Sequence, residues 1–147
     1  MRNTLSADLR AAMKAKETRR IATIRLMLAG IQERENASPT GKISDEETLQ
    51  VLQKMIRQRK ESIETYDKAG RAELAAAERE EIAIIEAYLP RQLTESEMRE
   101  AIAAMIQETA ATSPKDMGKV MGALKERFTG RLDFGAASAL VKQLLSR

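Results

Sequence analysis

The sequence contains no cysteine and no histidine, and aromatic side chains make up only 3% of its 147 residues. Without cysteine the chain has neither a disulfide framework nor a thiolate nucleophile. Without histidine it lacks the commonest general base and the commonest metal ligand. These absences remove most routes to nucleophilic, acid–base and metal-dependent catalysis.

Long apolar runs are also missing. The longest apolar stretches fall far short of the roughly 20 residues that a membrane-spanning helix needs. The first residues, MRNTL, lead into a polar helix with no apolar signal core. We therefore expect no membrane partner and a cytoplasmic location.

The residues that are present favour a globular helical protein. The chain is 43% hydrophobic and 32% charged, with a net charge of +3. Apolar residues recur at helical spacing, and no stretch alternates as a strand should. The fold class predicted is all-α, with helices at about residues 5–13, 17–36, 45–69, 71–88 and 114–128. A fifth helix is expected to open after residue 94 with its apolar stripe at 98–106, and a last one to follow Asp133 with residues 137–144 facing inward.

Helix boundaries divide the chain near Pro90. Ser44–Glu47 and Thr94–Glu97 have the pattern of capping boxes, in which side chains satisfy free amides at a helix start. Leu89 precedes Pro90 and is therefore disfavoured in the α conformation. We predict an N-terminal domain at residues 1–90, a helical hairpin domain of about four helices, and a three-helix tail domain at residues 91–147.

One charged pair is expected inside the hairpin. Arg59 lies on the apolar stripe of the third helix, and Glu81 lies on that of the fourth. If the two helices fold back at Gly70, Arg59 and Glu81 should meet. Because a buried arginine needs a carboxylate partner, we predict an ion pair between them that fixes the hairpin register.

Catalytic and metal-binding patterns are not found. Glu46 and Glu47 are adjacent on one helix, as are Glu80 and Glu81 on another, so neither pair converges on one point. No cluster has metal-ligand spacing, and no glycine-rich phosphate loop is present. We expect no cofactor, no metal and no catalysis by this chain alone.

The tail offers a candidate polyanion-binding surface. Opposite the apolar stripe of the sixth helix lie Lys115, Gly118, Lys119, Gly122 and Lys125. Bare glycine backbone with flanking lysines would let a phosphate chain approach closely. An equally weighted alternative is that the glycines admit another helix, and Glu126 on this face weakens the phosphate interpretation. Further basic candidates for nucleic-acid contact are Arg131 and Lys142 in the tail and, more weakly, a second set at Lys54, Arg57, Arg59 and Lys60.

Several segments resemble the YqeY-like (GatB/YqeY) family along essentially the whole chain. They are AMKAK at 12–16, RQRKESI at 57–63, AGR at 69–71, YLP at 88–90 and DMGKVM at 116–121. The tail alone is similar to the C-terminal domain of the GatB component of the glutamyl/aspartyl-tRNA amidotransferase. The last helix departs from the pattern, because DFGA at 133–136 replaces a common Asp-Gly-Lys and the usual asparagine after Lys142 is missing.

The resemblance implies an all-α fold with a small tail domain and tRNA as a ligand, contacted by residues 115–121 and Lys125. It also links the chain to carbon–nitrogen ligase activity with glutamine, although the catalytic body of that enzyme is absent here. The leading hypothesis is a non-catalytic tRNA-binding protein that assists a tRNA-dependent amidotransferase or another tRNA-handling protein. The alternatives are a protein-partner adaptor without RNA contact, or a component of amidotransferase activity.

Overall fold

The computed structural model describes residues 1–146 of the chain. In this range the protein is helical without any β-strand, which confirms the predicted all-α class. The elements are α1 (Arg2–Ala15), α2 (Thr18–Ala37), α3 (Asp45–Lys68), α4 (Ala72–Glu86), α5 (Glu95–Glu108), the 3-10 turn η1 (Pro114–Asp116), α6 (Met117–Phe128) and α7 (Phe134–Leu145).

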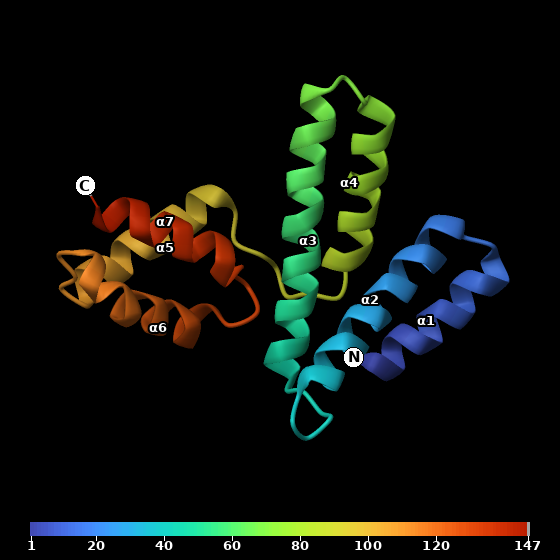
Figure 1. Cartoon of the computed structure of the whole chain (residues 1–147), viewed down its shortest axis with the longest axis horizontal. Helices are drawn as coiled ribbons and strands as arrows, with labels where there is room; N and C mark the ends of the chain where they lie inside the picture. The colour runs from blue at the N-terminus through green and yellow to red at the C-terminus, as the bar shows by residue number, and fades with distance from the viewer. Residues whose placement is uncertain (147) are drawn as a thin grey trace. The chain divides into compact units, whose positions relative to one another are not determined.

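The chain forms two compact units, Met1–Pro90 and Arg91–Arg147. The first contains α1 to α4, and the second contains α5 to α7 with η1 (Figure 1).

Both predicted capping boxes are present. Ser44 Oγ accepts from the Glu47 amide at 3.1 Å, and a Glu47 carboxylate oxygen accepts from the Ser44 amide at 3.3 Å. Thr94 and Glu97 make the same two bonds, at 3.1 and 3.0 Å. Each box satisfies amides that a helix start otherwise leaves free. The sequence therefore located the starts of α3 and α5 correctly.

The sixth predicted helix is interrupted at its start. Residues 114–116 form the 3-10 turn η1, and α6 begins at Met117. The Asp116 amide bonds the Ser113 carbonyl at 2.9 Å, and the Asp116 carboxylate accepts from the Thr112 amide at 2.9 Å. These bonds hold the first turn in the tighter 3-10 geometry. Lys115 therefore lies in the turn before α6.

The core of the first unit lies where α1, α2 and the end of α4 meet the first half of α3. Gly30 lets α2 cross α3 closely, because a Cβ added there would lie only 3.2 Å from Val51 Cγ1. The buried apolar residues of this core are Leu5, Ile24, Met27, Ile31, Leu52, Met55, Ile56 and Ile85.

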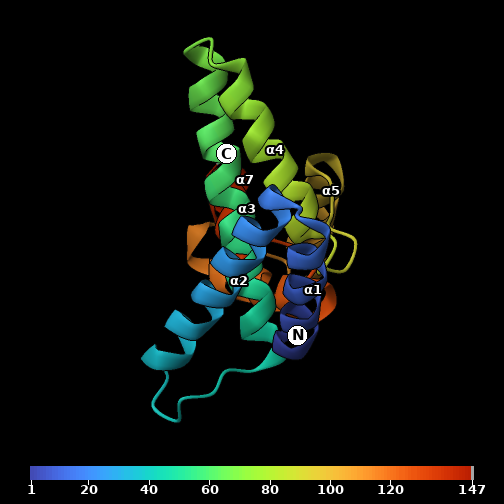
Figure 2. The ribbon, with the colours of Figure 1, turned by 90° about the vertical axis from the view of Figure 1, so that its right-hand side faces the viewer.

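The outer half of the α3–α4 hairpin is built differently. The two helices run side by side in both views (Figures 1 and 2). Between residues 57 and 84 the only fully buried residue is Ala75. Gly70, at φ 70°, makes the reversal, and the Arg71 amide returns to the Tyr66 carbonyl at 2.8 Å. Polar contacts therefore carry more of the packing here.

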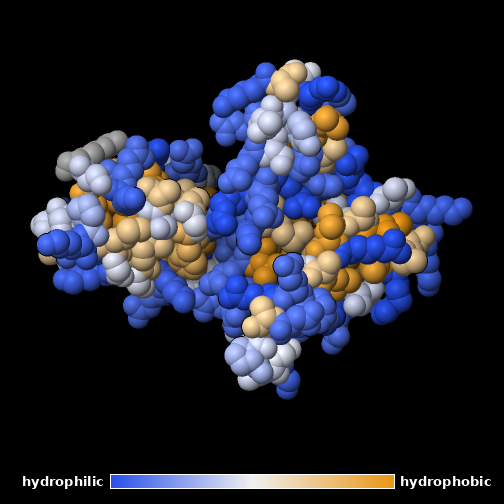
Figure 3. All heavy atoms as spheres, in the orientation of Figure 1, coloured by the Kyte–Doolittle hydropathy of each residue, from blue (hydrophilic) through white to orange (hydrophobic). Residues whose placement is uncertain are grey.

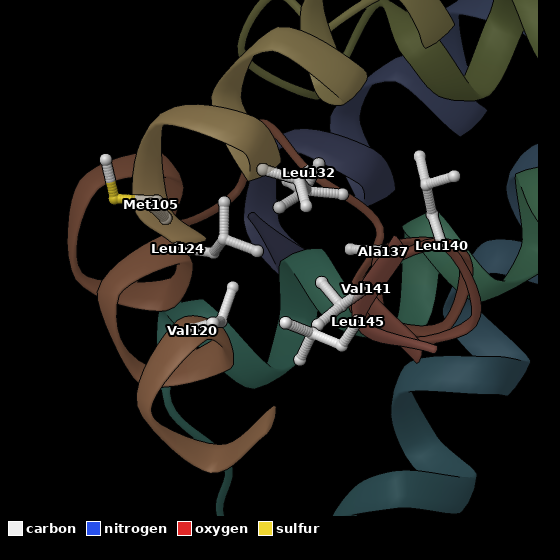
Figure 4. Close-up of a cluster of buried hydrophobic side chains, with 9 residues drawn as sticks. Met105, Val120, Leu124, Leu132, Ala137, Leu140, Val141 and Leu145 are labelled. Carbon is white, nitrogen blue, oxygen red and sulfur yellow. The ribbon is translucent and has the colours of Figure 1, made fainter. Parts of the chain in front are cut away.

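The second unit has a continuous apolar core contributed by all three of its helices (Figure 4). Its buried residues are Ile102, Met105, Val120, Leu124, Leu132, Ala137, Leu140, Val141 and Leu145. Leu124 and Val120 of α6 point toward Val141 of α7, and all three are completely buried. Burying one such side chain contributes about 1.5–3 kcal/mol.

A short segment before α5, Arg91–Leu93, bonds the turn between α6 and α7, and we call this segment the strap. The Leu93 amide bonds the Arg131 carbonyl at 2.9 Å, and Gln92 Nε2 donates to the Gly130 carbonyl at 2.6 Å. Arg91 also forms a two-pronged pair with Glu97, with both bonds at 3.0 Å. The strap thus ties the start of α5 to the turn between α6 and α7.

Candidate nucleic-acid interface

Helix α6 presents one apolar side and one open side, as its sequence predicted. Val120 and Leu124 are buried in the core of the second unit. The opposite side exposes Gly118, Lys119, Gly122 and Lys125, and Lys115 of η1 is also exposed. We call these five residues the lysine face.

The two glycines of the lysine face are uncovered within their own unit. A Cβ built at Gly118 or at Gly122 would meet no heavy atom within 4 Å. The alternative that these glycines accommodate another helix therefore finds no partner inside the second unit. Each glycine still costs about 1 kcal/mol relative to alanine in a helix interior.

Carboxylates lie beside two of the lysines. Lys119 Nζ is 3.9 Å from Asp116. The Thr112 backbone amide, above all, holds the pKa of Asp116 below its usual range, and the Ser113 amide and Lys119 act in the same direction. Glu126 is exposed on the same side of α6 as Lys125. Two negative groups thus offset part of the positive charge of three lysines.

The other two tail candidates have different surroundings. Arg131 is half-buried, and its Nε donates to the Arg91 carbonyl at 3.0 Å, so it serves the strap. Lys142 lies on the exposed side of α7. The structure therefore groups five of the seven predicted nucleic-acid residues on the lysine face and places Arg131 and Lys142 on separate elements.

Arg59 and Glu81 are brought together inside the first unit. Arg59 Nε lies 3.1 Å from Glu81 Oε2, and their side chains are only 12% and 18% exposed. The contact is not a two-pronged pair, because another guanidinium nitrogen donates to the Met55 carbonyl at 3.1 Å. Burial, reinforced by Glu81, raises the pKa of neighbouring Glu78. This cluster packs α3 against α4 and is set apart from the lysine face in sequence and element.

One long stretch of concentrated positive charge was missed by the sequence analysis. Residues 10–25 contain six basic side chains and one acidic one, Glu17. Arg19 pairs with Glu80 at 3.1 Å, and Arg20 pairs with Glu17 at 3.2 Å. The remaining four are Arg10, Lys14, Lys16 and Arg25, which we call the basic corner. All four are exposed, and none forms an ion pair with a residue in the range 1–146.

Counting charge over a short sliding window would have found the basic corner. The residues before Pro90 are nearly neutral as a whole, with 16 basic and 15 acidic side chains. That average hides the imbalance around the α1–α2 turn. A polyanion responds to the local charge density of the surface, because screening limits electrostatic interactions to about 8–10 Å.

No metal-binding cluster is found among the described residues. Across residues 1–146, no three acidic, histidine or cysteine side chains are grouped to hold a metal ion. In the same range, every helix is too short or too polar to cross a membrane.

The amino-acid sequence of the chain matches a known family over almost its full length. A family profile described as "Yqey-like protein" matches residues 2–145. The chain belongs to this YqeY-like family, which confirms the resemblance predicted from its motifs.

Several of its curated relatives carry the name "Altered inheritance of mitochondria protein 41, mitochondrial". The protein from Lachancea thermotolerans is 38% identical over 113 residues, covering 75% of this chain and 60% of the relative. The one from Clavispora lusitaniae is 29% identical over 147 residues, covering 97% and 84%. The chain spans 46–60% of the length of the first three relatives it matches.

These names correct one prediction. The sequence led us to expect a cytoplasmic location, but the relatives are named mitochondrial proteins, which points to the mitochondrion instead. The sequence prediction was wrong because it rested on absent apolar segments, and such an absence does not specify a compartment.

Proposed function

We propose that this YqeY-like chain is a non-catalytic RNA-binding protein, with tRNA as its ligand and the lysine face as a contact surface. The observation that carries the proposal is the open backbone at Gly118 and Gly122, flanked by exposed lysines. The names of its relatives suggest that it acts in the mitochondrion.

The lysine face suits phosphates better than bases. Lysine is a mobile point charge that attracts phosphate without reading sequence. A phosphodiester could approach the helix backbone at Gly118 and Gly122, where no side chain intervenes. The second unit contains no tyrosine or tryptophan, so stacking on bases would contribute little. Recognition would therefore depend on RNA shape and backbone charge.

Fluorescence anisotropy with labelled tRNA across a salt series tests this proposal. The full chain is compared with a Lys115→Ala/Lys119→Ala/Lys125→Ala variant. Each lost phosphate contact should reduce the slope of log affinity against log salt by about 0.7–0.9. The triple variant should therefore lose about two units of slope and bind more weakly at every salt concentration.

A matched control removes three exposed cations elsewhere in the chain, Lys42, Lys68 and Arg71. This control should bind as the unmodified chain does. Salt-insensitive binding, or equal loss in the two triple variants, would contradict a role for the lysine face. In that case the adaptor alternative, with a protein partner and no RNA contact, becomes the better description.

Participation in glutamine-dependent amidation requires a separate assay. Purified chain is incubated with charged tRNA, glutamine and ATP, with and without a tRNA-dependent amidotransferase. The proposal expects no amidated product from the chain alone. Product formation without the amidotransferase would overturn the non-catalytic assignment.

A further inference from the structure

The basic corner carries positive charge that no neighbouring carboxylate neutralises within the described residues. Its four cations, Arg10, Lys14, Lys16 and Arg25, are exposed without an ion pair inside residues 1–146. On the lysine face, by contrast, Lys119 lies near Asp116, and Glu126 shares the same side of α6. Helix α1 ends and helix α2 begins at the same turn. Arg10 and Arg25 therefore lie within about 10 Å of that turn, measured along the helix axes.

The chain places one cation of this corner, Lys16, in an unfavourable backbone conformation. Lys16 adopts a left-handed conformation at φ 57°, where glycine is the favoured residue. The first turn of α2 contains Arg19 and Arg20, and both are already paired, with Glu80 and with the N-cap residue Glu17. The presence of lysine rather than glycine at this left-handed position indicates that the charge itself has a use.

We propose that the basic corner is a second RNA-backbone contact, so that each unit of the chain carries one phosphate-binding surface. The inference rests on the proposed function for the nature of the ligand. Two modest surfaces on one chain can bind one RNA tightly, because the second contact forms at high effective concentration once the first has formed.

The structure favours RNA over a membrane surface as the partner. A membrane-binding amphipathic helix keeps an apolar face free for lipid and its basic residues on the other face. Here the apolar faces of α1 and α2 are already used in the core, through Leu5, Ile24 and Met27. The exposed large apolar side chains of this hairpin, Met13 and Leu26, are 48% and 49% exposed on different helices. On the visible face of α1 and α2, hydrophobic residues gather in an area that hydrophilic residues cross and border (Figure 3).

The central test compares full-length variants in the same anisotropy salt series with labelled tRNA. Arg10→Ala/Lys14→Ala/Arg25→Ala removes three corner cations, and Lys42→Ala/Lys68→Ala/Arg71→Ala is the charge-matched control. The corner variant should weaken binding on the order of tenfold at low salt and reduce the salt slope by about two. The control should leave both unchanged.

A single substitution separates charge from folding. Lys16→Gly removes one corner cation and relieves its left-handed backbone, so it should raise the melting temperature while weakening RNA binding severalfold. Ala110→Gly is the matched control, because Ala110 has nearly the same conformation, at φ 53°, in the second unit. It should raise the melting temperature and leave RNA affinity unchanged. A purely structural role for Lys16 predicts that both variants bind RNA normally.

The outcomes distinguish this inference from the proposed function. If the lysine-face variant loses RNA and the corner variant does not, the second contact is wrong and the proposed function stands. If only the corner variant loses RNA, the RNA ligand stands but the lysine face is wrong. If tRNA binds unchanged but vesicles of mixed phosphatidylcholine and phosphatidylglycerol bind only when the corner is intact, the corner is a lipid contact and the inference is overturned.

Discussion

The two units of this chain are held together in different ways. The smaller second unit surrounds nine buried apolar residues with three helices and a strap. The larger first unit has ten, eight of which form one cluster, and Ala12 and Ala75 lie outside that cluster. Its α3–α4 hairpin continues beyond that core with Ala75 as the only fully buried residue between 57 and 84.

The difference shows what a two-helix hairpin can and cannot bury. A third helix covers the apolar stripe of each partner in the second unit, so apolar packing alone can specify the arrangement. Beyond the core of the first unit, α3 and α4 pack mainly against each other, and the Arg19–Glu80 ion pair links α4 to α2. There Arg59 pairs with Glu81, and Arg79 pairs with Asp67 at 2.8 Å. Where no third helix covers the hairpin, these polar pairs help to determine how α3 packs against α4.

The largest expected effect is in the second unit. Leu124→Ala removes a completely buried side chain from the centre of a small core. We expect a loss of about 2–5 kcal/mol in the free energy of unfolding, from lost transfer energy and the cavity left behind. Urea denaturation followed by circular dichroism, with separate transitions fitted for each unit, measures it.

The control for this prediction is Leu74→Ala. Leu74 is 40% exposed on the outer hairpin, so its truncation should cost well under 1 kcal/mol. Equal losses in the two leucine variants would contradict the contrast between a packed unit and a polar hairpin.

The next effect is at the Arg59–Glu81 pair. Arg59→Met leaves Glu81 and neighbouring Glu78 half-buried without their cation. Because both partners keep some solvent access, we expect a loss of about 1–3 kcal/mol, less than for a fully buried pair. The double variant Arg59→Met/Glu81→Leu should recover most of this loss, and a double-mutant cycle measures the coupling.

A fully exposed pair calibrates that result. Lys68 and Glu64 lie 3.4 Å apart with more than 70% of each side chain exposed, and their coupling should be about 0.5 kcal/mol or less. If the Arg59–Glu81 coupling is no larger than this, the pair does not fix the hairpin register, and that part of the sequence prediction fails.

The sequence specified the helices well because their local signals are chemical. Ser44 and Thr94 mark helix starts through the reciprocal bonds that a hydroxyl and a carboxylate three residues apart can make. The start of α6 was predicted less well, because Asp116 bonds the preceding loop and tightens the first turn. Such a side-chain bond depends on how the loop folds, which periodicity does not report.

The candidate surfaces were predicted only in part for a similar reason. Helical spacing correctly put Gly118 and Gly122 on the open side of α6. Spacing could not show that Arg131 bonds the strap, because Arg91 is forty residues away in sequence. It also could not show how Arg59 divides its nitrogens between Glu81 and the Met55 carbonyl.

The smallest expected effect is a pH dependence at the capping boxes. Arg91 first, and then the Thr94 amide, lower the pKa of Glu97 from 4.5 to about 2. A lowered carboxyl pKa stabilises the folded state above about pH 4.5, and this stabilisation is lost as pH falls toward 2. Denaturation of the unmodified chain and of Glu97→Gln should therefore differ most at neutral pH and converge near pH 2.

Glu47 offers the corresponding test in the first unit. The Ser44 amide and Arg34 also lower its pKa. Glu47→Gln should therefore show the same direction of pH dependence in the transition of the first unit. A stability difference that grows on acidification would contradict both assignments.

The placement of the few aromatic side chains gives the first unit an optical signature of its own. Tyr66 and Tyr88 both belong to the first unit, and the chain has no tryptophan. The Tyr88 hydroxyl donates to the Asp8 carboxylate, and burial together with this bond raises the pKa of Tyr88 to about 12. Tyrosine emission therefore reports the first unit alone. Quenching by the Asp8 carboxylate should be relieved when α1 separates from the end of α4, which makes the natural chain its own fluorescent sensor for that event.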